Sequence, residues 1–466
     1  MSATDAVLKR IEREKETYLE ELKEYLRFPS ISTDPEYKKD VLATANWLAG
    51  KMRDAGLKAE LIQTKGNPLV YGEWLGAPGK PTILFYGHYD VQPVDPIDQW
   101  RHPPFEPTEE GDQLVCRGAT DDKGQSYTHV KAVAAMLKER GKLPVNVKFI
   151  VEGEEESGGH SIDEFVKADK GKKLGCDAVV VSDSSMYGPG QPALTYGLKG
   201  LVYMELKVTG PNRDLHSGTY GGGVQNPLTA LATIISRLIN QDTGRILIPG
   251  FYEDVRPLAK WERQEFAKLP FSEAKEKKEL GVPTLVSEKG STYREQVWAR
   301  PTLDVNGIFG GYQGKGAKTV LPSWAGAKVS MRLVPDQRPE RIARHFTQHV
   351  KKVTPRGVKV DVSYLHSAEA VLIPTEGPIA DAALEAMRAT WGKRPVRIRE
   401  GGSIPIVTTF YKVLKAPVLL LGFGLHDDRL HSPNEKFNIS HFYNGIRAVA
   451  RLLDQVAASR SSAAPA

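Results

Sequence analysis

The sequence predicts an α/β protein into which a second, α+β domain is inserted. In the first 199 residues, short apolar runs typical of buried strands alternate with segments of helical spacing. Between residues 200 and 372 the strands become alternating and half-buried, and from residue 373 the first pattern returns. We therefore assign residues 1–199 and 373–466 to one domain and residues 200–372 to the inserted domain.

The N-terminal segment predicts two helices before the first strand. Apolar residues recur at helical spacing from Ile11 to Leu26. This helix should end before Pro29, because the residue preceding a proline is disfavoured in the α region. A second helix fits residues 41–55 and is closed by Gly56.

The next segment predicts the sheet of the first domain. Buried strands are expected at residues 82–86, 145–151 and 178–182, with a helix at 126–140 between the first two. Strands that alternate with helices form a largely parallel sheet. In such sheets ligands bind outside the carboxyl ends of the strands, so side chains at those ends deserve inspection.

The remaining elements follow from the same patterns. In the inserted domain we expect strands at residues 202–208, 328–334 and 358–364. A helix is expected at residues 227–239. The first domain resumes with a helix at 378–390 and a buried strand at 418–421. Residues 459–466 are rich in Ser and Ala and are expected to be frayed.

Composition excludes several classes of function. The 466 residues include 63 Lys+Arg and 57 Asp+Glu, a net charge of +6 without a coherent basic stripe, so no nucleic-acid partner is expected. No run of about 18 apolar residues is present, so no membrane partner is expected. Two cysteines, Cys116 and Cys176, and the lack of a signal-peptide pattern indicate a cytoplasmic protein.

Acidic residues and histidines gather where the predicted strands end. The set comprises His88, Asp90, Asp121, Asp122, Glu154, Glu155, Glu156, Asp183 and His431. Carboxylates crowded at one sheet edge repel one another unless a cation lies among them. Two imidazoles and three carboxylates suit a pair of cations such as Zn²⁺ with one carboxylate bridging. A further carboxylate could accept the proton of an attacking water, and Asp90 could orient the ring of His88.

Each of these residues also has an ordinary structural explanation. His88 alone could be structural, and residues 154–156 alone could form a solvated loop. Asp121 and Asp122 could cap the following helix, and Asp183 could form an Asx turn. All of these explanations would have to hold together, and the shared position at strand ends favours a metal site instead.

An ordered set of motifs indicates a family. The chain resembles the cytosolic non-specific dipeptidase and carnosinase branch of the co-catalytic zinc metallopeptidases, which is related to aminoacylases and glutamate carboxypeptidase. The resemblance covers nearly the whole chain and is carried by residues 87–93 (GHYDVQP), 120–124 (TDDKG), 152–158 (EGEEESG), 214–218 (DLHSG), 332–335 (RLVP), 400–405 (EGGSIP) and 431–435 (HSPNE).

The resemblance implies a zinc-peptidase-like catalytic domain with an inserted ferredoxin-like lid and dimerisation domain. It implies two divalent metal ions, Zn²⁺ first and Mn²⁺ or Co²⁺ as alternatives. His88 and Asp183 would bind one ion, Glu156 and His431 the other, and Asp121 would bridge them. The general base would be Glu155, a cis peptide would follow Asp121, and Asp90 would support the site.

The resemblance also implies a homodimer and a set of substrate contacts. His216 would reach the partner subunit's active site and stabilise the oxyanion. Arg332 would bind the free carboxylate of a short peptide, with Thr319, Gly402 and Ser403 completing that end.

The implied activity is the metal-dependent hydrolysis of dipeptides or very short peptides with a free C-terminal carboxylate. The alternatives are an amidohydrolase of the same fold acting on N-acyl or N-carbamoyl amino acids, and a non-catalytic scaffold. The sequence departs from the dipeptidases at Glu154, where an uncharged residue is usual, and at residues 365–370, where glycines and a tryptophan are expected.

Overall fold

The structure is a computed structural model that describes residues 2–459, so the predicted frayed tail lies outside the described residues except for Ser459. The chain divides into two compact units. Unit 1 comprises Met1–Tyr196, Ile373–Ile398 and Thr409–Ala466, and unit 2 comprises Gly197–Leu372 and Arg399–Thr408. Relative to the predicted domain limits, unit 2 therefore also holds residues 197–199 and 399–408.

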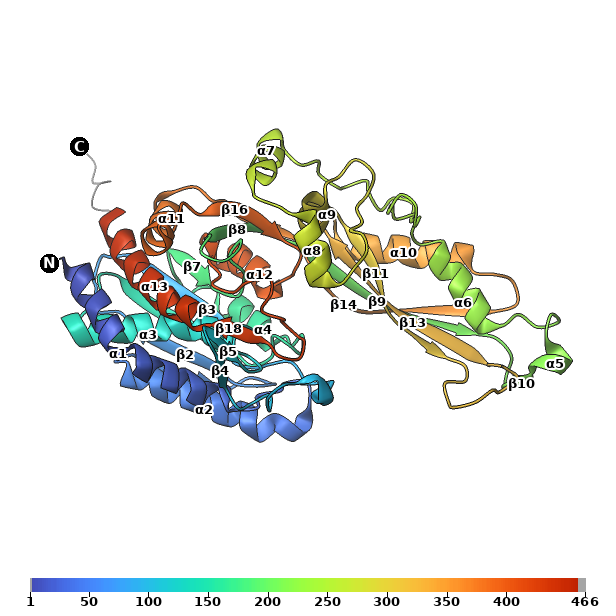
Figure 1. Cartoon of the computed structure of the whole chain (residues 1–466), viewed down its shortest axis with the longest axis horizontal. Helices are drawn as coiled ribbons and strands as arrows, with labels where there is room; N and C mark the ends of the chain where they lie inside the picture. The colour runs from blue at the N-terminus through green and yellow to red at the C-terminus, as the bar shows by residue number, and fades with distance from the viewer. Residues whose placement is uncertain (1, 460–466) are drawn as a thin grey trace. The chain divides into compact units, whose positions relative to one another are not determined.

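Unit 1 begins with the two predicted helices, α1 (Ala3–Leu26) and α2 (Lys38–Asp54) (Figure 1). Ser2 and Asp5 cap the start of α1 reciprocally, which satisfies two backbone N–H groups that have no partner within the helix. The helix ends before Pro29 as predicted, and its apolar face is buried in the core.

The sheet of unit 1 is mixed, with a parallel centre and antiparallel flanks. Its strands run in the order β1-β2-β6-β3-β7-β17-β8, and β6, β3, β7 and β17 are mutually parallel. Their bounds are β1 (Lys58–Ile62), β2 (Leu69–Trp74), β3 (Thr82–His88), β6 (Asn146–Glu152), β7 (Ala178–Val181), β8 (Ala193–Leu198) and β17 (Val418–Leu420). The expectation of a largely parallel sheet is correct for the centre, whereas β1, β2 and β8 pair antiparallel.

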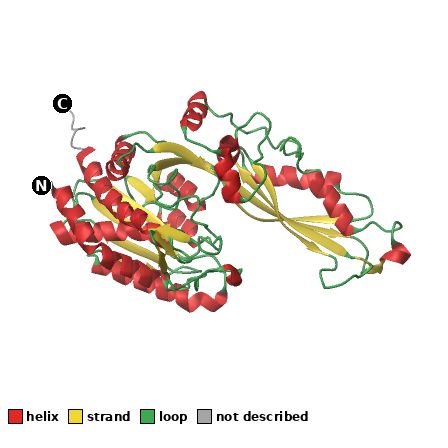
Figure 2. Ribbon diagram, viewed as in Figure 1, coloured by secondary structure: helices red, strands yellow, loops and turns green. Residues whose placement is uncertain are grey.

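Helices and a small sheet complete unit 1, and Figure 2 shows the helices around its strands. Helices α1, α3, α11 and α13 pack together through their apolar faces. The bounds are α3 (Lys123–Arg140), α4 (Ser161–Asp169), α11 (Pro378–Trp391), α13 (Ile439–Ser459), β4 (Thr108–Glu110), β5 (Gln113–Val115) and β18 (Lys436–Asn438). Strand β17 comes from the C-terminal part of the chain but lies inside the sheet, next to β7.

Unit 2 is built on an antiparallel sheet in the order β11-β13-β9-β14, with α6 and α10 packed on it. Alternate residues of β9, from Val202 to Val208, are buried against these helices, as period-two patterning predicts. The main bounds are β9 (Gly200–Thr209), α6 (Pro227–Ser236), β11 (Thr302–Gly310), β13 (Trp324–Leu333), α10 (Pro339–Val353) and β14 (Lys359–Ala368). These elements confirm an α/β protein with an inserted α+β domain.

Unit 2 also contains shorter helices and strands outside its main sheet. They are β10 (Leu215–His216), α5 (Ser217–Tyr220), α7 (Lys260–Lys268), α8 (Glu273–Leu280), α9 (Tyr293–Ala299), β12 (Val320–Leu321) and β15 (Val371–Leu372). Strand β16 (Val396–Glu400) and helix α12 (Pro405–Leu414) each include residues of both units. Across residues 2–459, the structure holds no helix with the length and hydropathy needed to cross a membrane.

Candidate metal centre

The predicted ligands of unit 1 come together where the parallel strands end. His88 is the last residue of β3, Asp183 follows β7 by two residues, and Asp121 precedes α3. Because β3 and β7 are parallel neighbours, their carboxyl ends lie at one edge of the sheet. Ligand atoms of His88, Asp121 and Asp183 all lie within 4.8 Å of one another.

A second group of ligands shares Asp121 with the first. Ligand atoms of Asp121, Glu156 and His431 also lie within 4.8 Å of one another. Nε2 of His88 lies 3.0 Å from Asp121 Oδ1, and Nε2 of His431 lies 3.0 Å from Asp121 Oδ2. Each carboxylate oxygen of Asp121 thus faces one of the two groups, which is the arrangement of a bridging ligand.

The charges of these two ligand groups fit a pair of cations. Burial raises the pKa of Glu156 well above its usual range, and the carboxylate of Asp121 acts in the same direction. Burial also raises the pKa of Glu155 to about 8, with Asp183 and Asp121 adding to the effect. Clustered buried carboxylates of this kind are stabilised by divalent ions, and imidazole nitrogen and carboxylate oxygen are donors that Zn²⁺ accepts.

The ordinary structural explanations fit these side chains poorly. His88 is fully buried and its ring faces Asp121, while the side chain of Glu156 is only 3% exposed. Asp122 precedes α3 but makes no side-chain capping hydrogen bond to it. The structure also contains the cis peptide between Asp121 and Asp122 that the family resemblance implies.

Asp90 contacts one residue of each ligand group, His88 and Glu156. Its backbone carbonyl, rather than its carboxylate, lies 3.0 Å from His88 Nδ1, and Oδ1 is farther away at 3.4 Å. Oδ2 of Asp90 accepts hydrogen bonds from Ser32 Oγ at 2.6 Å and from the Glu156 N–H at 3.0 Å. Asp90 therefore orients His88 through its backbone and Glu156 through its side chain.

The additional acid Glu154 is engaged away from the ligand groups. Its Oε1 accepts a hydrogen bond from the backbone N–H of Asn67 at 3.0 Å. Glu156, by contrast, accepts a hydrogen bond from Gln92 Nε2 at 2.7 Å. Of the three consecutive glutamates, Glu156 belongs to a ligand group, and Glu154 contacts the loop after β1.

The predicted substrate residues lie in unit 2 in two groups. Arg332 Nη1 donates to Ser403 Oγ at 3.0 Å, and the carbonyl of Gly402 accepts from the Lys199 N–H at 3.1 Å. Elsewhere in unit 2, the carbonyl of Thr319 accepts from the N–H of Ser217, next to His216. His216 Nδ1 accepts from the Gly218 N–H at 3.0 Å.

Two buried residues without a predicted role contact the predicted site residues: Lys199 beside Gly402, and Glu435 beside Asp121. Lys199 is 3% exposed and donates from Nζ to the Gln296 carbonyl at 3.1 Å. A lysine between the apolar runs of β8 and β9 is the sequence signal that could have revealed it. Glu435 is fully buried against the loop that carries Asp121, and the motif at residues 431–435 includes it without indicating its partners.

Comparisons with known proteins agree with this geometry. A family model described as peptidase family M20/M25/M40 matches residues 84–455. A Cys-Gly metallodipeptidase of Candida albicans is 35% identical over 95% of each chain, and a human Beta-Ala-His dipeptidase is 30% identical over 97% of this chain and 92% of its own.

Solved structures of dipeptidases share the fold of this chain. A Saccharomyces cerevisiae dipeptidase, Dug1p, superposes with a TM-score of 0.88 at 31% identity and covers 98% of this chain and 99% of its own. Human carnosine dipeptidase 1 superposes with a TM-score of 0.89 at 30% identity, with the same coverage. These findings confirm the resemblance in the sequence: the chain belongs to peptidase family M20/M25/M40.

Proposed function

We propose that this protein hydrolyses dipeptides, or very short peptides with a free C-terminal carboxylate, with two divalent metal ions bound in unit 1. The observation that carries the proposal is the pair of ligand groups that share Asp121. His88 and Asp183 hold one ion, and Glu156 and His431 hold the other. Zn²⁺ suits this mixture of imidazole and carboxylate ligands best, and Mn²⁺ or Co²⁺ can replace it.

The bound ions supply polarisation of the scissile carbonyl and activation of a water molecule. Glu155 acts as general base and passes the proton to the leaving amine. Its carboxylate is held beside the charges of Asp183 and Asp121 but belongs to neither ligand group. Asp90 supports the reaction indirectly, because it fixes His88 and the backbone of Glu156.

Unit 2 supplies the residues that recognise the substrate. Arg332 binds the terminal carboxylate, since its guanidinium offers a planar pair of donors and forms no salt bridge to the described residues. Ser403 holds one of its nitrogens, and Gly402 completes this end of the site. Thr319 belongs to the other group, beside His216. His216 stabilises the oxyanion in the active site of the partner subunit.

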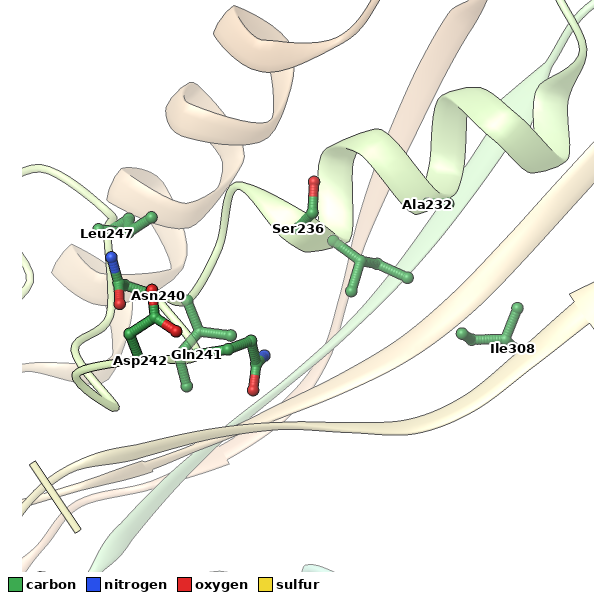
Figure 3. A pocket seen from close by; sticks show the side chains of 9 residues that line it. Ala232, Ser236, Asn240, Gln241, Asp242, Leu247 and Ile308 are labelled. Carbon is green, nitrogen blue, oxygen red and sulfur yellow. The ribbon is translucent and has the colours of Figure 1, made fainter. Parts of the chain in front are cut away.

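The active form is a homodimer that uses the β11 edge of the unit 2 sheet. Strand β11 is an edge strand, and its Ile308 is 59% exposed. Ile308 lines a surface pocket together with residues of α6 and the following loop, among them Ala232 and Leu247 (Figure 3). An exposed edge with apolar side chains is a template for pairing with a second copy.

The cytoplasm is the proposed compartment, because both cysteines are free and Cys116 is buried as a thiol. A reducing environment preserves this state. Fractionation of the cells that make the protein tests this assignment.

The deciding experiment combines metal analysis with substrate profiling of the purified chain. We expect two metal ions per chain and hydrolysis of dipeptides, including the Cys-Gly and β-Ala-His dipeptides named for the relatives. The same assay includes C-terminal amides and N-acyl or N-carbamoyl amino acids. Preference for the acylated amino acids would replace the proposal by an amidohydrolase, and no hydrolysis with Zn²⁺, Mn²⁺ or Co²⁺ supplied would point to a scaffold.

A further inference from the structure

The loop that carries Asp121 is bound at four points by one buried carboxylate, that of Glu435. Oε1 of Glu435 accepts hydrogen bonds from the backbone N–H groups of Thr120 and Asp121, both at 3.0 Å. Oε2 accepts from Arg117 Nη1 at 2.8 Å and from the Gly118 N–H at 3.0 Å. An ionised carboxylate has about four acceptor sites, and here every one has a donor.

Further contacts join the same loop to the segment that carries His431. The backbone carbonyl of Glu435 accepts from the Cys116 N–H at 3.0 Å. Thr120 Oγ1 lies 2.9 Å from Asp428 Oδ2 and 2.7 Å from the carbonyl of Lys436. Asp428 also accepts from Lys436 Nζ at 2.5 Å. The two segments, more than 300 residues apart in the chain, are thus fixed in register by buried polar contacts.

We propose that Glu435 is a positioning residue of the metal centre, which sets the bridging carboxylate of Asp121 against the imidazole of His431. The inference rests on the proposed function, because it assigns Glu435 a role toward the ions held there. Glu435 bonds the N–H of Asp121 itself and lies four residues from His431 in the chain. One side chain therefore controls the relative position of two ligands that come from distant segments.

Replacement by glutamine separates this role from simple fold stabilisation. Glu435→Gln keeps the size of the side chain but replaces one acceptor oxygen by an NH₂ group. This group faces N–H donors of residues 117–121 and cannot accept from them, so at least two of the four hydrogen bonds are lost. The loop then moves and carries Asp121 with it. Loss of an outer hydrogen-bond partner of a metal ligand weakens metal binding by about 10- to 100-fold.

A matched control exists in unit 2. Glu262 and Arg399 also form a buried acid–arginine pair, with side chains 6% and 8% exposed against 1% each for Glu435 and Arg117. Glu262→Gln therefore reports the cost of disturbing such a pair away from the metal centre. Glu435→Asp, which keeps the four acceptor sites but withdraws them by one methylene, gives an intermediate variant.

The experiment measures Co²⁺ binding to the full chain and its two variants by competition with a chelator, together with the visible spectrum of the bound Co²⁺. We expect Glu435→Gln to bind Co²⁺ about 10- to 100-fold more weakly and with an altered spectrum. Glu262→Gln should match the parent in both, even where its melting temperature falls. If Glu435→Gln does not fold, Glu435→Asp is measured in its place and should show a smaller shift in the same direction.

Two different failures are distinguishable. A parent chain that does not bind two Co²⁺ ions refutes the proposed function. A parent that binds them, with affinity and spectrum unchanged in the Glu435 variant that folds, refutes the positioning role alone.

Discussion

Arg332 and Ser403 meet although 71 residues separate them: Nη1 of the arginine donates to the serine Oγ at 3.0 Å. The hydroxyl of Ser403 in turn donates to the carbonyl of Lys199 at 2.5 Å. The Ser403 hydroxyl therefore uses its proton in the hydrogen bond to Lys199, and its oxygen accepts the hydrogen bond from Arg332. This relay holds one edge of the guanidinium and leaves its other N–H groups for a ligand.

Arg332→Ala should act selectively on substrates that carry a free carboxylate. A hydrogen bond to a charged group contributes about 1.5–3 kcal/mol, so kcat/KM for a dipeptide should fall by roughly 10- to 100-fold. The C-terminal amide of the same dipeptide should lose far less. Arg256→Ala, which removes an exposed arginine paired with Asp336, is the control. Equal losses for acid and amide would contradict the assigned role of Arg332.

Glu155→Gln should abolish turnover while the metal content stays intact. General base catalysis contributes about 10²- to 10⁴-fold, and glutamine cannot take the proton. The neighbouring Glu154→Gln is the matched control, because Gln can still accept the hydrogen bond from the Asn67 N–H. Initial rates and metal analysis on both variants check this. An inactive Glu154→Gln beside an active Glu155→Gln would exchange the two roles.

Removal of the metal ions should inactivate the protein and lower its melting temperature. Without cations, the buried carboxylates of Asp121, Glu155 and Glu156 repel one another. Ions at 100 times their Kd stabilise the fold by about 2.7 kcal/mol per independent site. Calorimetry before and after chelation, followed by return of Zn²⁺, Mn²⁺ or Co²⁺, measures both effects. Full activity after exhaustive chelation would be incompatible with the metal centre.

Lys199 should make the stability of the fold depend on pH above neutrality. Burial lowers the pKa of Lys199 to about 7; Arg332 and Arg300 act in the same direction, and Asp304 and Glu288 oppose them. Below this pKa the folded protein carries a buried charge, whereas above it the folded form is neutral and the unfolded form still binds a proton. Stability from this group therefore rises by about 1.4 kcal/mol per pH unit from pH 7 toward 10.

Lys199→Met isolates that effect. The variant should be more stable than the parent at pH 6.5, and this advantage should shrink steadily toward pH 9.5. Urea unfolding across this range, with the exposed lysine variant Lys58→Met as control, gives the comparison. A difference in stability that does not vary with pH would show that Lys199 keeps its charge in the folded protein.

Ile308→Asp should separate the proposed homodimer into monomers. A charge on the exposed face of β11 opposes burial against a second copy, and Ile308 contributes little to the core of unit 2 because it is 59% exposed. Light scattering after gel filtration reports the mass, and Val286→Asp, at another exposed position, is the control. A monomeric parent chain, or a dimer that survives the substitution, would remove β11 from the interface.

The elements that local patterns define could be predicted, and those that long-range pairing defines could not. Helix α1 has a continuous apolar face and a proline beyond its end, so its limits follow from the sequence. Strand β11 was not predicted, because Asp304, Asn306 and Gly307 interrupt its pattern and a bulge shifts its register at Val305/Gly307. The antiparallel flank of the larger sheet was missed since β1 is short, contains Lys58 and Glu60, and is only partly buried.

The same distinction applies to the site. His88 and Asp183 could be placed together because they follow strands that a parallel sheet brings side by side. Glu435 could not be assigned, because its four donors lie in a loop more than 300 residues earlier and no local pattern relates the two segments. Asp90 could be placed beside His88 from the sequence, but the contact of its backbone carbonyl with His88 Nδ1 could not, since a backbone carbonyl carries no sequence signal.

The place of β17 within the larger sheet has a consequence for biosynthesis. This strand lies between β7 and β8 but leaves the ribosome long after both of them. The edges of β7 and β8 that pair with β17 can therefore be paired only after residues 418–420 have been synthesised. His431 follows only after that, so the protein acquires its complete set of metal donors in the last moments of its synthesis.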